Sequence, residues 1–419
     1  MKTETVTGRC GASPKSPARL VRGAVPLLAL LIALCTFCAC LRPMSVERCG
    51  YVVAIGIDAG SEREFEITLE LQRESVSEAQ TDGGSLILSC EARDVFEAVS
   101  ILAANAAYDL NFTRTHLFII GEALAREGRL GEVLNLSYDV LRIRKSALMV
   151  IARCPVRDYI GGLASNNTAN VAKMQDALIS NVETTGETAA INLSLFFEAV
   201  EDGRFDPVMP IGYYDESIIT DMKQRDSAKK GENPIADAQK GGRIGGMQGI
   251  TKGCALFDGE TMCAELDEAE TRLMNLVRGD YRRGTFAYPL ENGKTASLLV
   301  FPNKREITVE LGGEKPRALV KLRLSITVER DPGASIVSLW EAGERERLAS
   351  YLSGELKRVF IKCRQAGSDA MGFGRYASMR FFSTEAWEAY GWKRVYPSLE
   401  VRFEIEPTLD DEYMTRHGG

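Results

Sequence analysis

The sequence predicts a multi-domain protein of the α+β or mixed α/β class, with a C-terminal antiparallel sheet covered by a long helix. Three observations lead to this prediction. Strand-like and helix-like runs alternate in the first half of the chain, consecutive segments of the last third have the two-residue period of half-buried strands, and a helical apolar stripe follows them. A chain of 419 residues also exceeds what one hydrophobic core usually supports.

Residues 40–214 are expected to form an N-terminal mixed α/β domain. Apolar runs and alternating apolar residues indicate strands, whereas apolar residues at three- and four-residue spacing indicate helices. On this basis, strands are expected at residues 51–57, 65–71, 117–120 and 148–151, and helices at residues 94–107 and 122–127.

A change in composition follows this domain. Residues 215–249 are charged and rich in glycine, with almost no large apolar side chains. Such a segment buries too little surface to fold by itself, so we expect a linker or loop there. The next segment, residues 250–295, is expected to contain a hairpin.

The hairpin signal is centred on Asp258 and Gly259. If these two residues form the loop, counting outward along both strands places Cys254 opposite Cys263. The two Cα atoms would then lie about 4.5 Å apart, as in a non-hydrogen-bonded pair. This separation permits a disulfide between Cys254 and Cys263. Two small buried thiols are the alternative, and the sequence leaves both interpretations open.

Residues 296–410 are expected to form a C-terminal α+β domain, followed by a short tail at residues 411–419. Its strands show alternating apolar residues before and after one long helical segment. Gly367 fits the C-terminal end of that helix. The apolar stripe that should lie on the sheet consists of Leu348, Leu352, Leu356, Val359, Phe360 and Cys363.

The first 39 residues have the pattern of a lipoprotein signal peptide. Basic residues precede an uncharged apolar run that begins at Ala24, and the run ends in the small residue Ala39 followed by Cys40. We therefore expect cleavage before Cys40 and lipidation of its thiol. Because the apolar run is close to the minimum length of a spanning helix, an uncleaved anchor remains the alternative.

Composition and charge exclude several functions. The net charge of −7 disfavours binding to nucleic-acid phosphates. Only two histidines, His116 and His417, occur, and the cysteines lack metal-binding spacing, so no metal site and no cofactor are expected. His116 begins an apolar run and is interpreted as a structural residue. Without a recognisable nucleophile and base, no catalytic residues are assigned.

Aromatic residues are dense between Phe373 and Tyr396. We expect most of them to pack in the core, and any exposed ones to offer a surface for a partner. The nearby Gly372-Phe373-Gly374 segment does not fit a dinucleotide-binding loop, because a helix precedes it and Ala377 occupies the position of the third glycine.

An ordered set of short motifs resembles the Ger(x)C family, the lipoprotein C subunits of spore nutrient-germinant receptors. Each motif is weak alone, but together they span nearly all of the chain after the signal peptide in the family's order. The motifs are Cys40, Gly56-Ile57-Asp58, the segment Thr115-His116 through Ile120-Gly121-Glu122, Asp206-Pro207-Val208-Met209-Pro210, Gly372-Phe373-Gly374, Trp387, and Tyr396-Pro397-Ser398-Leu399-Glu400-Val401.

The resemblance implies a non-enzymatic lipoprotein of the spore germination machinery, carrying a lipid such as palmitate on Cys40. It implies a location on the outer face of the spore inner membrane, beside polytopic A and B subunits. The three subunits together are needed for nutrient-triggered germination. A solute-binding or general cell-envelope lipoprotein is the alternative.

Overall fold

The structure is a computed structural model that describes residues 49–72, 85–106, 108–166, 171–214, 249–290, 295–330 and 343–409. Several features expected from the sequence lie outside the described residues. These are the signal peptide at residues 1–39, the lipidation site Cys40, nearly all of the 215–249 segment and the tail at residues 411–419. No helix among the described residues is long and apolar enough to cross a membrane.

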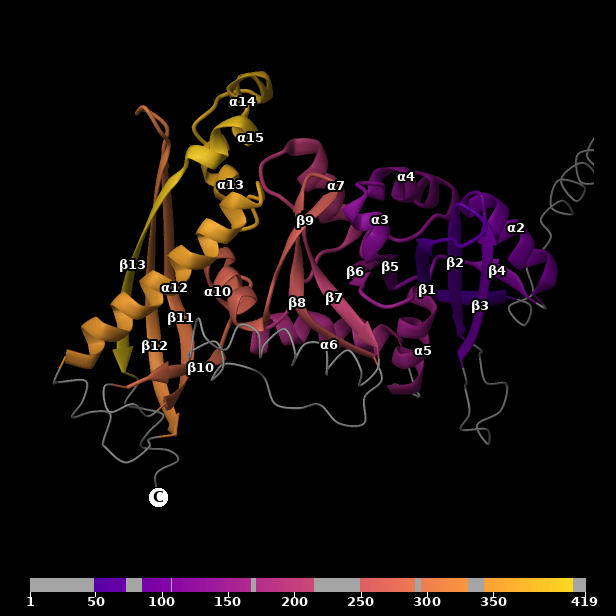
Figure 1. Cartoon of the computed structure of the whole chain (residues 1–419), viewed down its shortest axis with the longest axis horizontal. Helices are drawn as coiled ribbons and strands as arrows, with labels where there is room; N and C mark the ends of the chain where they lie inside the picture. The colour runs from indigo at the N-terminus through magenta and orange to yellow at the C-terminus, as the bar shows by residue number, and fades with distance from the viewer. Residues whose placement is uncertain are drawn as a thin grey trace, which may run out of the picture. The chain divides into compact units, whose positions relative to one another are not determined.

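The first sheet has the strand order β3-β2-β1-β5-β6-β7-β8-β9, and β4 pairs with β1. Strands β1, β5, β6 and β7 run parallel at its centre, and the pairs at both sides are antiparallel (Figure 1). Its strands are β1 (Cys49–Ala59), β2 (Phe65–Gln72), β3 (Ser85–Ala92), β4 (Asp109–Asn111), β5 (Leu117–Gly121), β6 (Leu148–Ala152), β7 (Val208–Tyr214), β8 (Gly249–Asp258) and β9 (Thr261–Leu266).

Helices cover both faces of this sheet, which explains why its central strands are apolar without interruption. In β5, Phe118 and Ile120 join one core, whereas Leu117 and Ile119 join the core on the opposite face. The helices are α2 (Val95–Asn105), α3 (Glu122–Arg126), α4 (Leu130–Leu141), α5 (Val156–Asn166), α6 (Val171–Thr184) and α7 (Leu193–Asp202). The strands and helices expected from the sequence in this region are confirmed, with small shifts at their ends.

The expected hairpin is present as β8 and β9, and it extends the first sheet. Its register also differs from the expected one, because Asp258 pairs with Thr261 and a bulge follows Leu256. Cys254 consequently lies opposite Leu266, so the predicted pairing with Cys263 was wrong. Both thiols are free in the structure. The geometric argument for a disulfide therefore no longer holds.

The second sheet has the order β10-β11-β12-β13, and the long helix α12 (Arg345–Gln365) packs on it (Figure 1). All six residues of the expected apolar stripe of α12 are buried against the sheet, which confirms the predicted fold class. The strands are β10 (Gly284–Pro289), β11 (Thr295–Glu310), β12 (Arg317–Arg330) and β13 (Glu400–Leu409).

One strand direction differs from the expectation for this sheet. Strands β10, β11 and β12 pair antiparallel, but β13 is parallel to β12. A parallel neighbour needs a long crossover connection, and α12 together with four short helical segments provides it. These segments are α13 (Phe373–Ser378), α14 (Thr384–Tyr390), α15 (Trp392–Val395) and the 3₁₀ helix η3 (Tyr396–Ser398).

The helix α10 (Glu268–Arg278) follows β9 and connects the first sheet to the second. Its buried Leu273, Met274 and Val277 belong to the same core as α12 and the second sheet. Cys254 and Leu256 of β8 contribute to that core as well. The two sheets are therefore joined through a continuous apolar contact and not only through the chain.

Candidate functional site: a charged junction that gathers the motifs

Asp206 of the Asp-Pro-x-x-Pro motif is the centre of a charged junction between chain segments far apart in sequence. Its side chain is almost fully buried. One carboxylate oxygen, Oδ2, accepts a hydrogen bond from the Asp369 backbone N–H at 2.7 Å. The other, Oδ1, accepts from the Gly259 N–H at 3.1 Å and is ion-paired with Lys393. Lys393 Nζ also lies 2.5 Å from Asp258 Oδ1.

Asp369 is the second buried carboxylate of this junction. It accepts hydrogen bonds from the backbone N–H groups of Phe373 at 2.8 Å and Gly374 at 2.6 Å, and from Trp392 Nε1 at 2.9 Å. Burial raises the pKa of Asp369 to about 7, although these three donors favour its charged form. The structure thus holds a titratable group inside the junction.

The backbone conformation at Gly372 and the close packing at Gly374 require the two glycines of the Gly-Phe-Gly motif. Gly372 has a φ of 76°, a conformation that costs other residues free energy. A β-carbon on Gly374 would lie 2.4 Å from the Arg204 carbonyl oxygen and 2.6 Å from Trp392 Nε1. The motif therefore provides close packing of α13 against the Asp206 segment.

The aromatic residues expected in the core surround this junction. Trp387, Trp392 and Tyr396 are buried, and the Tyr396 hydroxyl donates to the Ser368 carbonyl at 2.8 Å. Trp387 Nε1 donates to the Asp202 carbonyl at 3.2 Å. Phe382 is an exception, because it is fully exposed. The prediction that most of these aromatic residues pack inside is confirmed.

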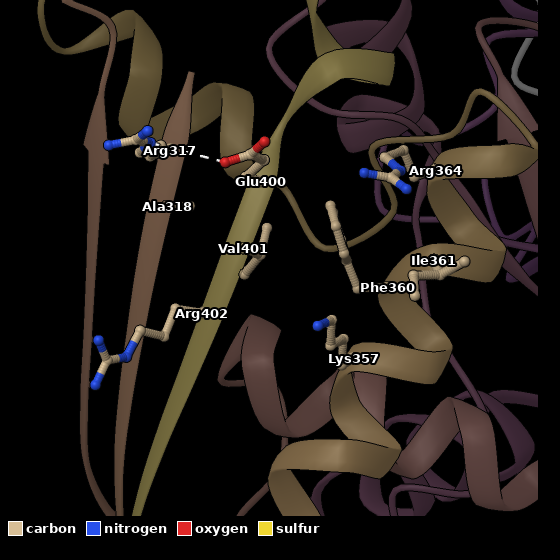
Figure 2. Close-up of a pocket in the computed structure, with 9 residues that line it drawn as sticks. All are labelled: Arg317, Ala318, Lys357, Phe360, Ile361, Arg364, Glu400, Val401 and Arg402. Carbon is tan, nitrogen blue, oxygen red and sulfur yellow. Dashed lines mark ion pairs between the residues drawn. The ribbon is translucent and has the colours of Figure 1, made fainter. Parts of the chain in front are cut away.

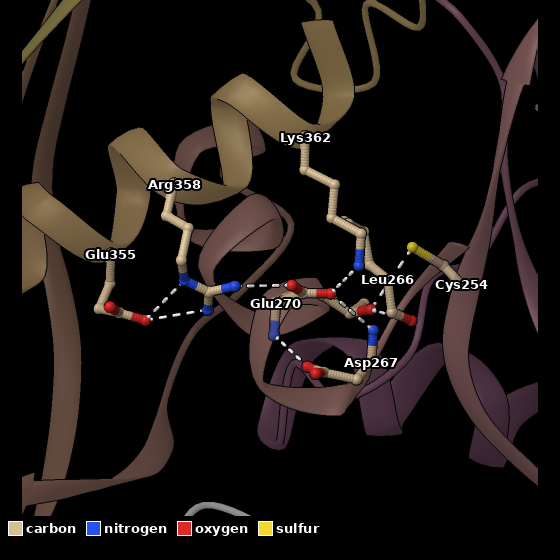
Figure 3. Close-up of polar contacts among 8 residues, drawn as sticks. Cys254, Leu266, Asp267, Glu270, Glu355, Arg358 and Lys362 are labelled. Atoms are coloured by element: carbon tan, nitrogen blue, oxygen red, sulfur yellow. Dashed lines mark hydrogen bonds and ion pairs between the residues drawn. The ribbon is translucent and has the colours of Figure 1, made fainter. Parts of the chain in front are cut away.

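A second charged cluster lies where α10 crosses α12 (Figure 3). Glu270 is buried, and its carboxylate oxygens lie 2.8 Å from Arg358 Nη1 and 2.5 Å from Lys362 Nζ. Glu270 also closes a capping box with Asp267 at the start of α10. Burial raises the pKa of Glu270, but Lys362 and Arg358 outweigh burial and hold this pKa below its usual value.

The Gly-Ile-Asp motif ends β1 and supports α5. Asp58 Oδ2 accepts a hydrogen bond from the Val156 backbone N–H at 3.1 Å, which caps the first turn of α5. A β-carbon on Gly56 would lie 2.1 Å from Val156 Cγ1, and one on Gly121 would lie 2.1 Å from Asp58 Oδ1. The glycines of two motifs are thus required for close packing at the ends of β1 and β5.

Glu122, the acidic residue of the next motif, forms an ion pair at the ends of the parallel strands. Arg153 Nε lies 2.8 Å from Glu122 Oε2, and Arg153 also pairs with Glu265 of β9. His116 lies just before β5, where its backbone N–H and C=O bond to neighbouring strands. Its ring Nε2 is 3.1 Å from Arg144 Nη2.

Sequence reasoning identified part of this junction. It singled out Asp206, Gly374 and Trp387 as motif residues, but assigned no common place to them. It missed Asp369 and Lys393 of the junction and Glu270 of the second cluster. The only signal for Asp369 was a charged residue within an otherwise small and apolar segment after α12. Among the described residues, no group of three His, Cys, Asp or Glu side chains is placed to hold a metal ion.

Comparison with known proteins gives the family. Residues 43–212 match the family described as spore germination protein N-terminal domain, and residues 252–412 match the one described as spore germination B3/GerAC-like, C-terminal. Together, these matches cover most of the chain.

The chain belongs to the GerAC-like spore germination proteins.

This result confirms the resemblance deduced from the motifs and supports a role as a germinant-receptor C subunit. A solved structure, described as the crystal structure of the GerBC protein, is similar to this chain with a TM-score of 0.49 and 12% sequence identity. That match covers 85% of this chain and 97% of the other. No curated protein matches the chain.

Proposed function

We propose that this protein is a lipid-anchored, non-enzymatic C subunit of a spore germinant receptor. In this role it lies on the outer face of the spore inner membrane, and it assembles with polytopic A and B subunits to couple a nutrient signal to germination. The observation that carries the proposal is the family match at residues 43–212 and 252–412, directly after a segment with the pattern of a lipoprotein signal.

The roles of the motif residues support a scaffold. Asp58 and Asp206 accept hydrogen bonds from backbone N–H groups far away in the sequence and fix those segments to one another. Asp369 accepts from the nearby N–H groups of Phe373 and Gly374 and fixes the start of α13. Carboxylates bonded in this way stabilise a fixed arrangement of the chain. A subunit that works by presenting surfaces to its partners needs such a fixed arrangement.

Spore germination tests the receptor role. Spores that lack this chain and its paralogues are triggered once with nutrients and once with a receptor-independent agent, and dipicolinate release is measured. We expect loss of the nutrient response alone, restored when the wild-type chain is supplied. An unchanged nutrient response would favour a general cell-envelope lipoprotein and contradict the proposal.

The anchor is tested by replacing the cysteine expected to carry the lipid. In Cys40→Ala, we expect loss of labelled palmitate and release of the protein from the membrane, or failure of maturation. The matched control is Cys38→Ala, which changes a neighbouring cysteine of the signal and should keep both label and membrane attachment. Full membrane retention of Cys40→Ala with normal germination would refute the lipid anchor.

A further inference from the structure

A shallow groove of about 380 Å³ lies between β13 and the second half of α12 (Figure 2). Its apolar part includes Phe360 and Ile361 of α12 and Val401 of β13. Four of its nine lining side chains are exposed, so the groove is open to solvent. The exposed lining residues are Arg317, Lys357, Glu400 and Arg402.

The lining of the groove is basic, although the whole chain carries a net charge of −7. Lys357 and Arg364 of α12 place two cations on the Val401 side of β13. The side chains of Arg317, Glu400 and Arg402 extend from the opposite face of the sheet (Figure 2). Lys357 is exposed and forms no ion pair or hydrogen bond with any residue that the structure describes. The groove therefore has positive charge to offer to an acidic partner.

The other cations have partners that position them. Arg364 Nη1 donates to the Leu399 carbonyl at 3.1 Å, and its guanidinium lies over the Phe360 ring. Arg402 pairs with Glu404 at 3.1 Å, and Arg317 with Glu400 at 3.7 Å. Arg364 is thus fixed beside the apolar floor, where it adds positive charge without closing the groove.

The edge of β13 adds backbone groups to this site. The Glu400 N–H donates a hydrogen bond to the Pro316 carbonyl, on the β12 side of the strand. Because backbone groups alternate in direction along a strand, the N–H and C=O of Val401 are directed away from β12, toward the side of α12. On that side, side chains of α12 already occupy the Leu399 and Phe403 carbonyls. The backbone of Val401 lies between these two occupied carbonyls.

The edge is not suited to a long added strand. The backbone of Pro407 faces the same side of β13 as that of Val401, but Pro407 has no N–H to donate. Further pairing toward the end of β13 is therefore blocked. The occupied carbonyls of Leu399 and Phe403 limit pairing nearer the groove. The geometry accommodates a short segment that contacts β13 at Val401 alone.

We propose that this groove binds a short acidic segment of a partner protein. A carboxylate of that segment lies against Lys357, Arg364 and the Val401 N–H, and an adjacent apolar side chain rests on Phe360 and Ile361. The partner's chemistry follows from the groove, whereas its assignment to another receptor subunit rests on the proposed function.

Two other occupants fit less well. Small-molecule sites usually bury most of their ligand, and a groove with four exposed lining side chains does not. The chain's own acidic residues after β13, Asp410, Asp411 and Glu412, directly follow Leu409, at the opposite end of β13 from Val401. At about 3.3 Å per residue, three residues are too short to return along the strand to the groove.

Peptide binding to the full-length protein in detergent micelles tests this inference. The probe is a fluorescein-labelled peptide in which glutamate alternates with leucine, and a lysine–leucine peptide of equal length is compared with it by fluorescence anisotropy. We expect only the acidic peptide to bind, and its affinity to fall with added salt. Equal binding of the two peptides would overturn the proposal.

Two substitutions address the groove directly. Lys357→Glu should weaken binding of the acidic peptide about tenfold or more, since it reverses the unpaired charge. Val401→Pro removes one outward N–H, leaves the β12 side of the ladder intact and should also weaken binding. The matched control Arg157→Glu makes the same charge change at an exposed residue of α5, and this variant should bind as the wild type does. Circular dichroism checks that each variant is folded.

Two competition arms separate the other occupants. If free glutamate displaces the peptide at low concentration, the groove is a small-molecule site and the proposal is wrong. If vesicles containing phosphatidylglycerol bind through Lys357 while the peptide does not, the groove is a lipid contact and the proposal is wrong. These measurements use the isolated protein, so their failure leaves the receptor role to be decided by the spore experiment.

Discussion

The junction around Asp206 and the groove around Lys357 use charge in opposite ways. At the junction, the carboxylates of Asp206 and Asp369 are buried and surrounded by hydrogen-bond donors. In the groove, the Lys357 ammonium is exposed beside an apolar floor and lacks a partner among the described residues. Buried and fully bonded charge holds the fold together, whereas exposed charge over an apolar floor is available to another molecule.

The largest effect is expected from Asp206→Ala. This change leaves the Lys393 ammonium and two backbone N–H groups without their buried acceptor, so we expect a loss of about 3–5 kcal/mol in the free energy of unfolding. Chemical denaturation measures it. The control Asp258→Ala removes the exposed partner of the same lysine and should cost at most about 1 kcal/mol. Similar losses in the two variants would show that the junction does not depend on buried charge.

Glu270→Gln tests the second buried carboxylate. The change replaces the carboxylate with a neutral amide, so Lys362 and Arg358 lose their shared buried negative charge and one acceptor oxygen. We expect about 2–4 kcal/mol of destabilisation. In the control Glu355→Gln, only one ion pair of Arg358 is lost, and the cost should stay below about 1 kcal/mol. If Glu270→Gln proved neutral, the contact between α10 and α12 would have to rest on apolar packing alone.

Asp369 gives the junction a pH dependence. Because burial raises its pKa in the folded state to about 7, above its usual value, the folded protein holds this proton more tightly than the unfolded chain. The stabilising contribution is therefore complete below about pH 4 and is lost as the pH rises to about 7. We expect the stability difference between wild type and Asp369→Asn to shrink over this range. A difference independent of pH would contradict the raised pKa.

The local pattern of the chain was sufficient to predict much of this fold. The apolar stripe of α12 has a helical period that the sequence displays directly, and the uninterrupted apolar runs of β5 and β6 fit strands buried on both faces. The hairpin was also visible, but its register was not, because Asp258 pairs with Thr261 instead of lying in the loop, and the bulge after Leu256 shifts one strand by a further residue. Strand period indicates which residues face inward, and it does not specify such local irregularities.

The junction itself was beyond the reach of local patterns. Asp206 and Asp369 are separated by 163 positions, and nothing in the sequence near either residue indicates the other. Local patterns did not indicate the parallel direction of β13 either, because this direction depends on how α12 and the helices after it lead the chain back across the sheet. The family motifs singled out Asp206 and Gly374 separately, and only the structure showed that their segments are in contact.

The smallest effect is expected when two lysines of the same helix, α12, are compared. Lys357→Ala removes an exposed charge without a described partner and should change the free energy of unfolding by less than about 0.5 kcal/mol. Lys362→Ala removes a donor from buried Glu270 and should cost about 1–3 kcal/mol. Denaturation of both variants compares the two kinds of charge on one scaffold. If Lys357→Ala were the more destabilising change, the groove would be part of the protein's internal packing and its lysine would not be free for a partner.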